Sequence, residues 1–299
     1  MSYFEPPKVI KSEVFATVPE KYRKPGGKAH GRSKPHSFLE GPSFDRDGNL
    51  YVTDIPHGRI FRVSTKGAMD VAAEYDGEPN GLKIHKDGRI FIADHKNGIM
   101  LMDPKTGGVT PHVAGPDKER FKGVNDLVFA SNGDLYFTDQ GQTGLHDPTG
   151  RVYRLGADGR LDRLLDNVPS PNGIVPSRSE RALFVAATRA NAIWLVPMTP
   201  RGGVSKVGLF VQLPCPGPDG MALDEEGNLA VAHASLGVAW LFDTTGVPLY
   251  RVESCAGKMV TNLAYGGEGR RFLYMTESQT GTVMRAEMPT PGKPLYSHS

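Results

Sequence analysis

One phrase recurs six times along this chain, and the recurrence limits the possible folds more than any other feature. Each copy contains a polar residue, an apolar stretch, a turn and a β-rich run, as in EGPSFDRDGNLYVTD and NDLVFASNGDLYFTD. The six copies begin at Glu40, Asn80, Asn125, Asn172, Asp219 and Thr261. Successive copies therefore lie 40 to 47 residues apart. Repeats of this length are typical of propellers and solenoids.

Each repeat predicts four β-strands. Asp47-Gly48 and Asn132-Gly133 stand where a tight hairpin turn needs a positive φ. The runs after these turns, such as residues 50–52, are β-branched and aromatic, as in strands that are buried on both faces. A further strand, such as residues 59–63, and a second turn follow in each unit. We therefore predict an all-β fold, a six-bladed β-propeller with four-stranded antiparallel blades.

The whole chain, residues 1–299, is predicted to form a single propeller domain, because each blade buries its faces against its neighbours. Residues 9–18 precede the first repeat and are expected to supply the outermost strand of the last blade, which closes the ring. Residues 19–37 are basic, rich in Gly and Pro and without pattern, so they are predicted to form a surface loop.

The composition argues against several classes of partner. The chain has 35 Lys and Arg against 33 Asp and Glu, which gives a net charge of +2. A net charge this small does not attract nucleic acid or an anionic membrane. It has no apolar run near the roughly 20 residues of a membrane-spanning helix. Two cysteines, and a start without the pattern of an export signal, favour a reducing compartment. We expect a cytoplasmic protein, a monomer or small homo-oligomer, with no nucleic-acid or membrane partner.

The residues that open the six repeats are all polar, and equivalent blades would bring them to equivalent places near the channel axis. Glu40 and Asp219 would repel each other in a narrow channel, and a divalent cation would remove that conflict. Ligands that are all oxygen favour a hard ion such as Ca²⁺, Mg²⁺ or Mn²⁺. The alternative is that Asn80, Asn172 and Asp219, each followed by Gly, only mark turns.

Four motifs in order, EGPSF, VNDLVF, SPNGIV and GPDGMALDEEGNL, resemble the senescence marker protein/gluconolactonase family over roughly residues 38–277. The resemblance implies a six-bladed propeller that holds one divalent metal at the channel centre and hydrolyses sugar lactones. It implies Glu40, Asn172 and Asp219 as metal ligands and Asn125 as a contact to metal or substrate. Asp219 also matches the general base. Ca²⁺ is the expected ion, with Mg²⁺, Mn²⁺ and Zn²⁺ as alternatives.

The chain departs from the family at Gly123, since sugar-lactone hydrolases often have an arginine shortly before the NDL-type motif. Lys122 or Arg120 is a candidate replacement. His95 and His233 are candidate proton shuttles or hydrogen-bonded structural histidines. The expected substrate-binding residues are Asn80, His95, Lys122, Asn125, Gln140 and His146.

Three functions are compatible with this pattern. The first is a metal-dependent lactonase, in which the ion polarises the lactone carbonyl and water attacks it. The second is hydrolysis of phosphotriester or fluorophosphate bonds, as in diisopropyl fluorophosphatase, which has a similar ring. The third is a non-catalytic binding platform. The repeats lack the Trp-Asp dipeptide of WD-repeat platforms, and a platform has no need of two carboxylates on its axis.

Overall fold

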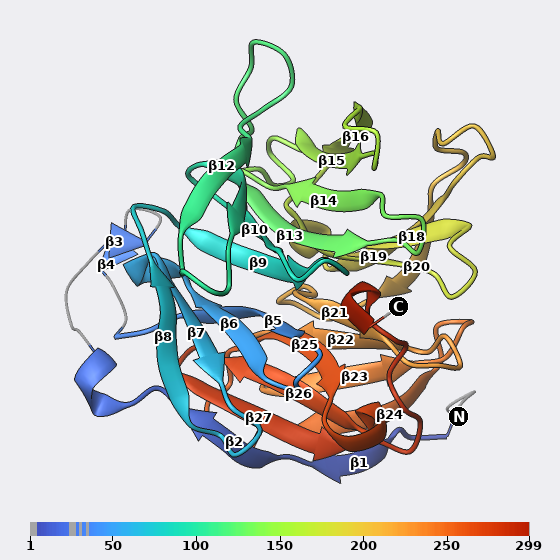
Figure 1. Cartoon of the computed structure of the whole chain (residues 1–299). Helices are drawn as coiled ribbons and strands as arrows, with labels where there is room; N and C mark the ends of the chain where they lie inside the picture. Colours follow the sequence, from blue (N-terminus) through green and yellow to red (C-terminus); the bar gives the residue numbers. More distant parts are fainter. Residues whose placement is uncertain (1–4, 24–27, 30–31, 34–35, 299) are drawn as a thin grey trace.

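Six β-sheets surround a central channel in a computed structural model that describes residues 5–23, 28–29, 32–33 and 36–298. Figure 1 shows the six blades following one another around the channel in sequence order. Each blade has four antiparallel strands, so the prediction of a six-bladed β-propeller is confirmed.

The strands have the same order in every blade, from the axis outwards. The innermost strands are β5 (Leu39–Phe44), β9 (Pro79–Ile84), β13 (Val124–Phe129), β17 (Pro171–Pro176), β21 (Met221–Leu223) and β25 (Val260–Gly266). The second strands are β6 (Leu50–Asp54), β10 (Ile90–Asp94), β14 (Leu135–Asp139), β18 (Ala182–Ala187), β22 (Leu229–His233) and β26 (Phe272–Glu277).

The third and fourth strands form the outer half of each blade. The third strands are β7 (Arg59–Val63), β11 (Gly98–Met102), β15 (Gly150–Leu155), β19 (Ala192–Pro197), β23 (Val238–Phe242) and β27 (Thr282–Glu287). The outermost strands are β8 (Met69–Glu74), β12 (Val109–Val113), β16 (Leu161–Val168), β20 (Gly208–Gln212), β24 (Pro248–Glu253) and β2 (Glu13–Thr17).

The N-terminal segment joins two blades. β2 pairs antiparallel with β27 and so supplies the fourth strand of the sixth blade. β1 (Lys8–Lys11) pairs parallel with β24 and adds a fifth strand to the fifth blade. Because β1 and β2 are separated by a single residue, the segment connects the fifth and sixth blades along their outer edges (Figure 1).

The segment predicted as a surface loop, residues 19–37, is described only in part. It includes the 3-10 helix η1 (Glu20–Tyr22) and a short ladder between β3 (Lys28–Ala29) and β4 (Arg32–Ser33). Residues 24–27, 30, 31, 34 and 35 lie outside the described residues.

The core consists of six clusters of buried apolar side chains, each shared by two neighbouring blades. The turn glycines Gly48 and Gly133 have φ of +80° and +89°, as hairpin turns of this kind require.

One of the apolar clusters joins Val52 and Phe61 of the first blade to Val283 of the sixth, where the ring closes. Packing between neighbouring blades therefore stabilises the ring.

Helices are short in the described residues. Besides η1 they comprise four one-turn 3-10 helices: η2 (Ile55–His57), η3 (Thr188–Ala190), η4 (Glu268–Arg270) and η5 (Tyr296–His298). None of the helices in the described part of the chain has the length and apolar character needed to cross a membrane.

Candidate functional site

We call the six residues that open the repeats the axial ring: Glu40, Asn80, Asn125, Asn172, Asp219 and Thr261. Five of them lie inside innermost strands, and Asp219 lies two residues before β21. The pairing register shifts at or beside Glu40, Asn80, Asn125, Asn172 and Thr261, which marks a β-bulge in each of those blades. A bulge turns a side chain out of the regular alternation. Asn80-Gly81 and Asn172-Gly173 are therefore parts of strands, and the alternative that these two dipeptides only mark turns is wrong.

Glycine follows the ring residue where neighbouring innermost strands approach closely. A Cβ on Gly41, whose φ is +54°, would lie 2.5 Å from the carbonyl oxygen of Asn80. A Cβ on Gly173 would lie 2.5 Å from the carbonyl oxygen of Asp219. The dipeptides thus reflect tight packing around the axis.

Four carboxylates at the ends of second strands hold the backbone before the axial ring. We call Asp54, Asp94, Asp139 and Glu277 the strand-end acids. Each accepts a hydrogen bond from the backbone N–H two residues before a ring residue, namely those of Phe38 (2.8 Å), Glu78 (3.0 Å), Gly123 (2.8 Å) and Met259 (3.1 Å). The predicted site residues do not include these acids, although the sequence carries the signal, because each of these repeats ends its second strand in an acid.

The axial ring is enclosed. Five of its residues are buried, with Thr261 at 1% exposure and Asn172 at 8%, whereas Asp219 remains partly exposed. Asp219 is thus the most exposed residue of the axial ring. Its Oδ1 atom is nevertheless buried, with no hydrogen-bond partner among the described residues.

The carboxyl groups near the axis resist ionisation. Burial raises the pKa of Glu40 to about 8; Asp126 raises it too, and a hydrogen bond from Asn262 opposes the shift. Burial also raises the pKa of Asp219 well above its ordinary value, and repulsion from Glu40 and Asp126 adds to the shift. These are the effects expected of acidic groups that are buried close to one another.

Two polar residues at the axis, Asp126 and Asn262, are absent from the predicted site, and each directly follows a ring residue. Both are 2% exposed, and Nδ2 of Asn262 donates to Oδ2 of Asp126 at 3.4 Å across the channel. Burial raises the pKa of Asp126, while the positive charge of Lys83 opposes that shift. The sequence carries a signal for them, because the other four repeats have glycine at this position.

The donor set at the axis suits a hard divalent cation. No three His, Cys, Asp or Glu side chains within the described ranges are grouped to hold a metal ion. The ligand set that the resemblance implies needs only two carboxylates, with two amide oxygens beside them. The two carboxylates balance a charge of +2, and binding would satisfy the orphaned Oδ1 of Asp219. The residues present therefore fit such an ion.

The predicted substrate-binding residues fall into two groups. Asn80 and Asn125 are buried in the ring, and Asn125 is hydrogen-bonded to Gln140. Lys122 and His146 are exposed, and the Lys122 amine is hydrogen-bonded to Thr149. The structure therefore places Lys122 and His146 in the loops beside the ring.

The two candidate histidines have different surroundings. The His95 ring lies beside Gly123, since a Cβ on that glycine would be 2.2 Å from Cε1 of His95. His95 thus fills the space next to the position where the departure from the family occurs. His233 is fully buried, with Nε2 bound to the carbonyl oxygens of Pro214 and Pro216 and Nδ1 accepting from Trp240 at 3.0 Å. His233 is therefore a structural histidine.

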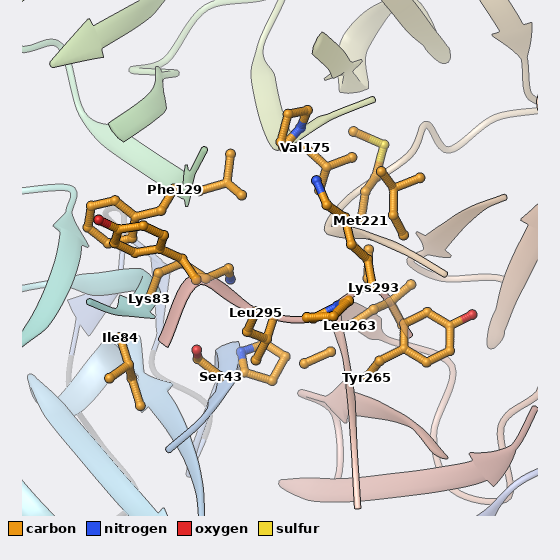
Figure 2. A pocket seen from close by; sticks show the side chains of 18 residues that line it. Ser43, Lys83, Ile84, Phe129, Val175, Met221, Leu263, Tyr265, Lys293 and Leu295 are labelled. Carbon is orange, nitrogen blue, oxygen red and sulfur yellow. The ribbon is translucent and has the colours of Figure 1, made fainter. Parts of the chain in front are cut away.

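A cavity of about 90 Å³ lies towards the other end of the channel. Apolar side chains from the ends of the innermost strands line it, together with the C-terminal segment 293–296. Figure 2 shows the side chain of Lys83 directed into this cavity, with Phe129, Val175 and Leu263 around it. The C-terminal segment thus contributes to the lining of the channel on this side.

Comparison with known proteins identifies relatives for this architecture. The sequence profile of the SMP-30/Gluconolactonase/LRE-like region matches residues 38–279. Lactonase drp35 of Staphylococcus aureus strain MW2 is 32% identical over 238 residues, which cover 74% of this chain and 71% of that protein.

Solved structures share the fold. A gluconolactonase from Xanthomonas campestris superimposes with a TM-score of 0.75 at 24% identity, covering 85% of this chain and 86% of that one. A calcium-binding protein, regucalcin, from Agrobacterium tumefaciens strain C58 superimposes with a TM-score of 0.78 at 23% identity, covering 97% and 99%. At these identities the likeness shows the fold alone.

Proposed function

Because the chain belongs to the SMP-30/gluconolactonase/LRE-like family, we propose that it is a hydrolase that opens a lactone ring with one divalent cation bound at the axial ring. The observation that carries the proposal is the enclosed pair of Glu40 and Asp219: burial raises the pKa of both carboxyl groups, and Oδ1 of Asp219 has no hydrogen-bond partner among the described residues. The lactonase relatives and the calcium-binding regucalcin neighbour support the same assignment.

The chain's own residues have distinct roles in this proposal. Glu40, Asn125, Asn172 and Asp219 would hold the cation, which when bound supplies a Lewis acid for the lactone carbonyl. Asp219, the partly exposed ring residue, accepts a proton from the attacking water. The water oxygen bonds to the carbonyl carbon, the ring C–O bond breaks, and the departing ring oxygen takes the proton held by Asp219. The products are a hydroxyl group and a carboxylic acid, which ionises to a carboxylate. Asn125 and Asn172 are neutral and leave the positive charge of the site intact.

Removal of the metal and substitution of Asp219 test this function. We expect chelation to abolish lactone hydrolysis and Ca²⁺, Mn²⁺ or Mg²⁺ to restore it. Asp219→Asn keeps an oxygen donor but loses the base, so it should lower kcat by roughly 10²–10⁴. Asp219→Ala should also weaken metal binding. Asp166→Asn, on the exposed outer strand β16, is the matched control. Full activity after complete metal removal would reject the proposal.

A substrate panel separates the lactonase from the related hydrolase. Aldonolactones, aliphatic lactones and phosphotriesters should be tested with the same metal-loaded protein. We expect lactones to be hydrolysed fastest, because the sequence relatives are lactonases. If phosphotriesters are hydrolysed faster than lactones, the protein is a phosphotriesterase that uses the same metal site.

A further inference from the structure

A chain of hydrogen bonds runs from the fourth blade to the axial ring through Gln140. Nε2 of Gln140 donates to Oγ of Ser170 at 2.9 Å. Oε1 of Gln140 accepts from Nδ2 of Asn125 at 3.1 Å. Both ends of the Gln140 amide are therefore engaged, one with each neighbour.

In this arrangement the nitrogen end of the Asn125 amide faces Gln140. An asparagine side chain has a donor end and an acceptor end, which exchange places when the amide turns over. Turning over the Asn125 amide alone would lose this bond, and turning over both amides would require Ser170 to donate to Gln140 instead of accepting from it. The oxygen end is thus left for the channel, and oxygen is the donor that a hard cation requires. The reverse arrangement would present an NH₂ group to a positive ion.

Thr143 holds the backbone of Gln140 in place. The Thr143 hydroxyl donates to the carbonyl oxygen of Gln140 at 2.7 Å and accepts from the backbone N–H of Ser170 at 3.1 Å. Thr143 is 7% exposed and Ser170 is 5% exposed, so water competes little for these bonds. The loop after β14 is therefore connected through Thr143 to the start of the fourth blade.

We propose that Gln140 is a positioning residue that orients the Asn125 amide, so that Oδ1 of Asn125 is presented to the cation. The inference rests on the proposed function, since it assumes a cation at the axial ring. It also replaces the substrate-binding role expected for Gln140 with a role in metal affinity. Partners of this kind typically change metal affinity by about 10–100-fold when they are lost.

Three variants test the role. Gln140→Met keeps the length of the side chain but removes both hydrogen bonds. Gln140→Glu keeps an acceptor for Nδ2 of Asn125, and Ser170 can donate to its second oxygen. Gln212→Met is the matched control, because Gln212 also bridges two loop carbonyls, Ala190 and Asn191, but lies on the outermost strand β20.

Calcium affinity should be measured by titration calorimetry on the metal-stripped full chain, with kcat and KM from the loaded protein as a second readout. We expect Gln140→Met to bind Ca²⁺ roughly 10-fold more weakly. Gln140→Glu and Gln212→Met should bind at least as tightly as the parent protein. If Gln140→Met and Gln140→Glu lose Ca²⁺ affinity equally, or if neither loses any, the orienting role of Gln140 is wrong, while the proposed metal site stands. A parent protein that binds no Ca²⁺, Mg²⁺ or Mn²⁺ overturns the proposed metal site and this role with it.

Discussion

Glu40 is held by the fold in its protonated form over much of the neutral range when no cation is present. Burial raises its pKa to about 8, against an ordinary value of 4.5 for glutamic acid. Between these two values the unfolded chain has released this proton and the folded chain still binds it. The unfolded state then binds fewer protons, so the free energy of unfolding falls as the pH rises. Asp219, whose pKa is raised in the same direction, adds to the effect.

The metal-free protein should therefore lose stability between about pH 5 and pH 8. Glu40→Gln, which cannot ionise, should show a smaller fall, because only the Asp219 contribution remains. Cation binding must displace these protons, so Ca²⁺ should stabilise the parent protein more at pH 8 than at pH 5. Urea unfolding at both pH values, with chelator and with excess Ca²⁺, measures these differences. If the free energy of unfolding depends on pH in the same way for the parent protein and for Glu40→Gln, the prediction is wrong.

At the scale of the strand, the strand-end acids connect the second strand of a blade to the backbone before the axial ring. Asp54 does so at the end of β6 while also pairing with Arg59 at the start of β7. Its Oδ2 atom accepts from Nε and Nη2 of Arg59 at 3.0 Å and 2.6 Å, and Arg59 is 1% exposed. This single carboxylate therefore balances a buried charge and positions the start of β5.

Asp54→Ala should be strongly destabilising, because it leaves the Arg59 guanidinium buried without its partner. Breaking one side of such a pair costs about 3–5 kcal/mol. Asp70→Ala, which removes the exposed pair of Lys21 and Asp70 at 3.5 Å, should cost at most about 1 kcal/mol. Urea denaturation of the two variants gives both values. Similar midpoints for the two variants contradict the role assigned to Asp54.

The sequence predicts the blades well because their signals are local and repeated. A turn glycine such as Gly48 and the run that follows it are sufficient to place a hairpin. Equal spacing also predicts that Glu40 and Asp219 meet, since equivalent positions in a propeller converge on the axis. Asp126 and Asn262 stand where the other four repeats have glycine, which distinguishes them in the sequence, but the contact of their side chains across the channel forms only when all six blades are closed. The fifth strand β1 escapes prediction for a similar reason, because parallel pairing with a distant edge has no local signature.

The whole molecule is held together at both chain ends. The N-terminal strands join the outer edges of the fifth and sixth blades, and the C-terminal residues 292–297 cross the channel at the end opposite the axial ring. The segment reaches all six blades through the following partners: Arg270, Leu223, Glu180, Phe129, His85 and Phe44. The rings of Tyr296 and Phe129 stack at 5.0 Å, and the Ser297 hydroxyl donates to the carbonyl oxygen of Phe44 at 3.3 Å. The C-terminal segment therefore restrains the blades from moving apart at the end opposite the axial ring.

Removing residues 291–299 should destabilise the propeller while leaving the axial ring in place. Loss of a packed aromatic side chain alone costs about 3 kcal/mol or more, and the deletion also exposes the cavity that the segment lines. Lys293→Met, the control, removes only the partly exposed pair with Glu180 at 3.1 Å and should cost about 1 kcal/mol or less. Urea denaturation measures both variants, and calorimetry at low temperature should show that the truncated protein still binds Ca²⁺. An unchanged unfolding midpoint after truncation would mean that packing between blades holds the ring without the C-terminal segment.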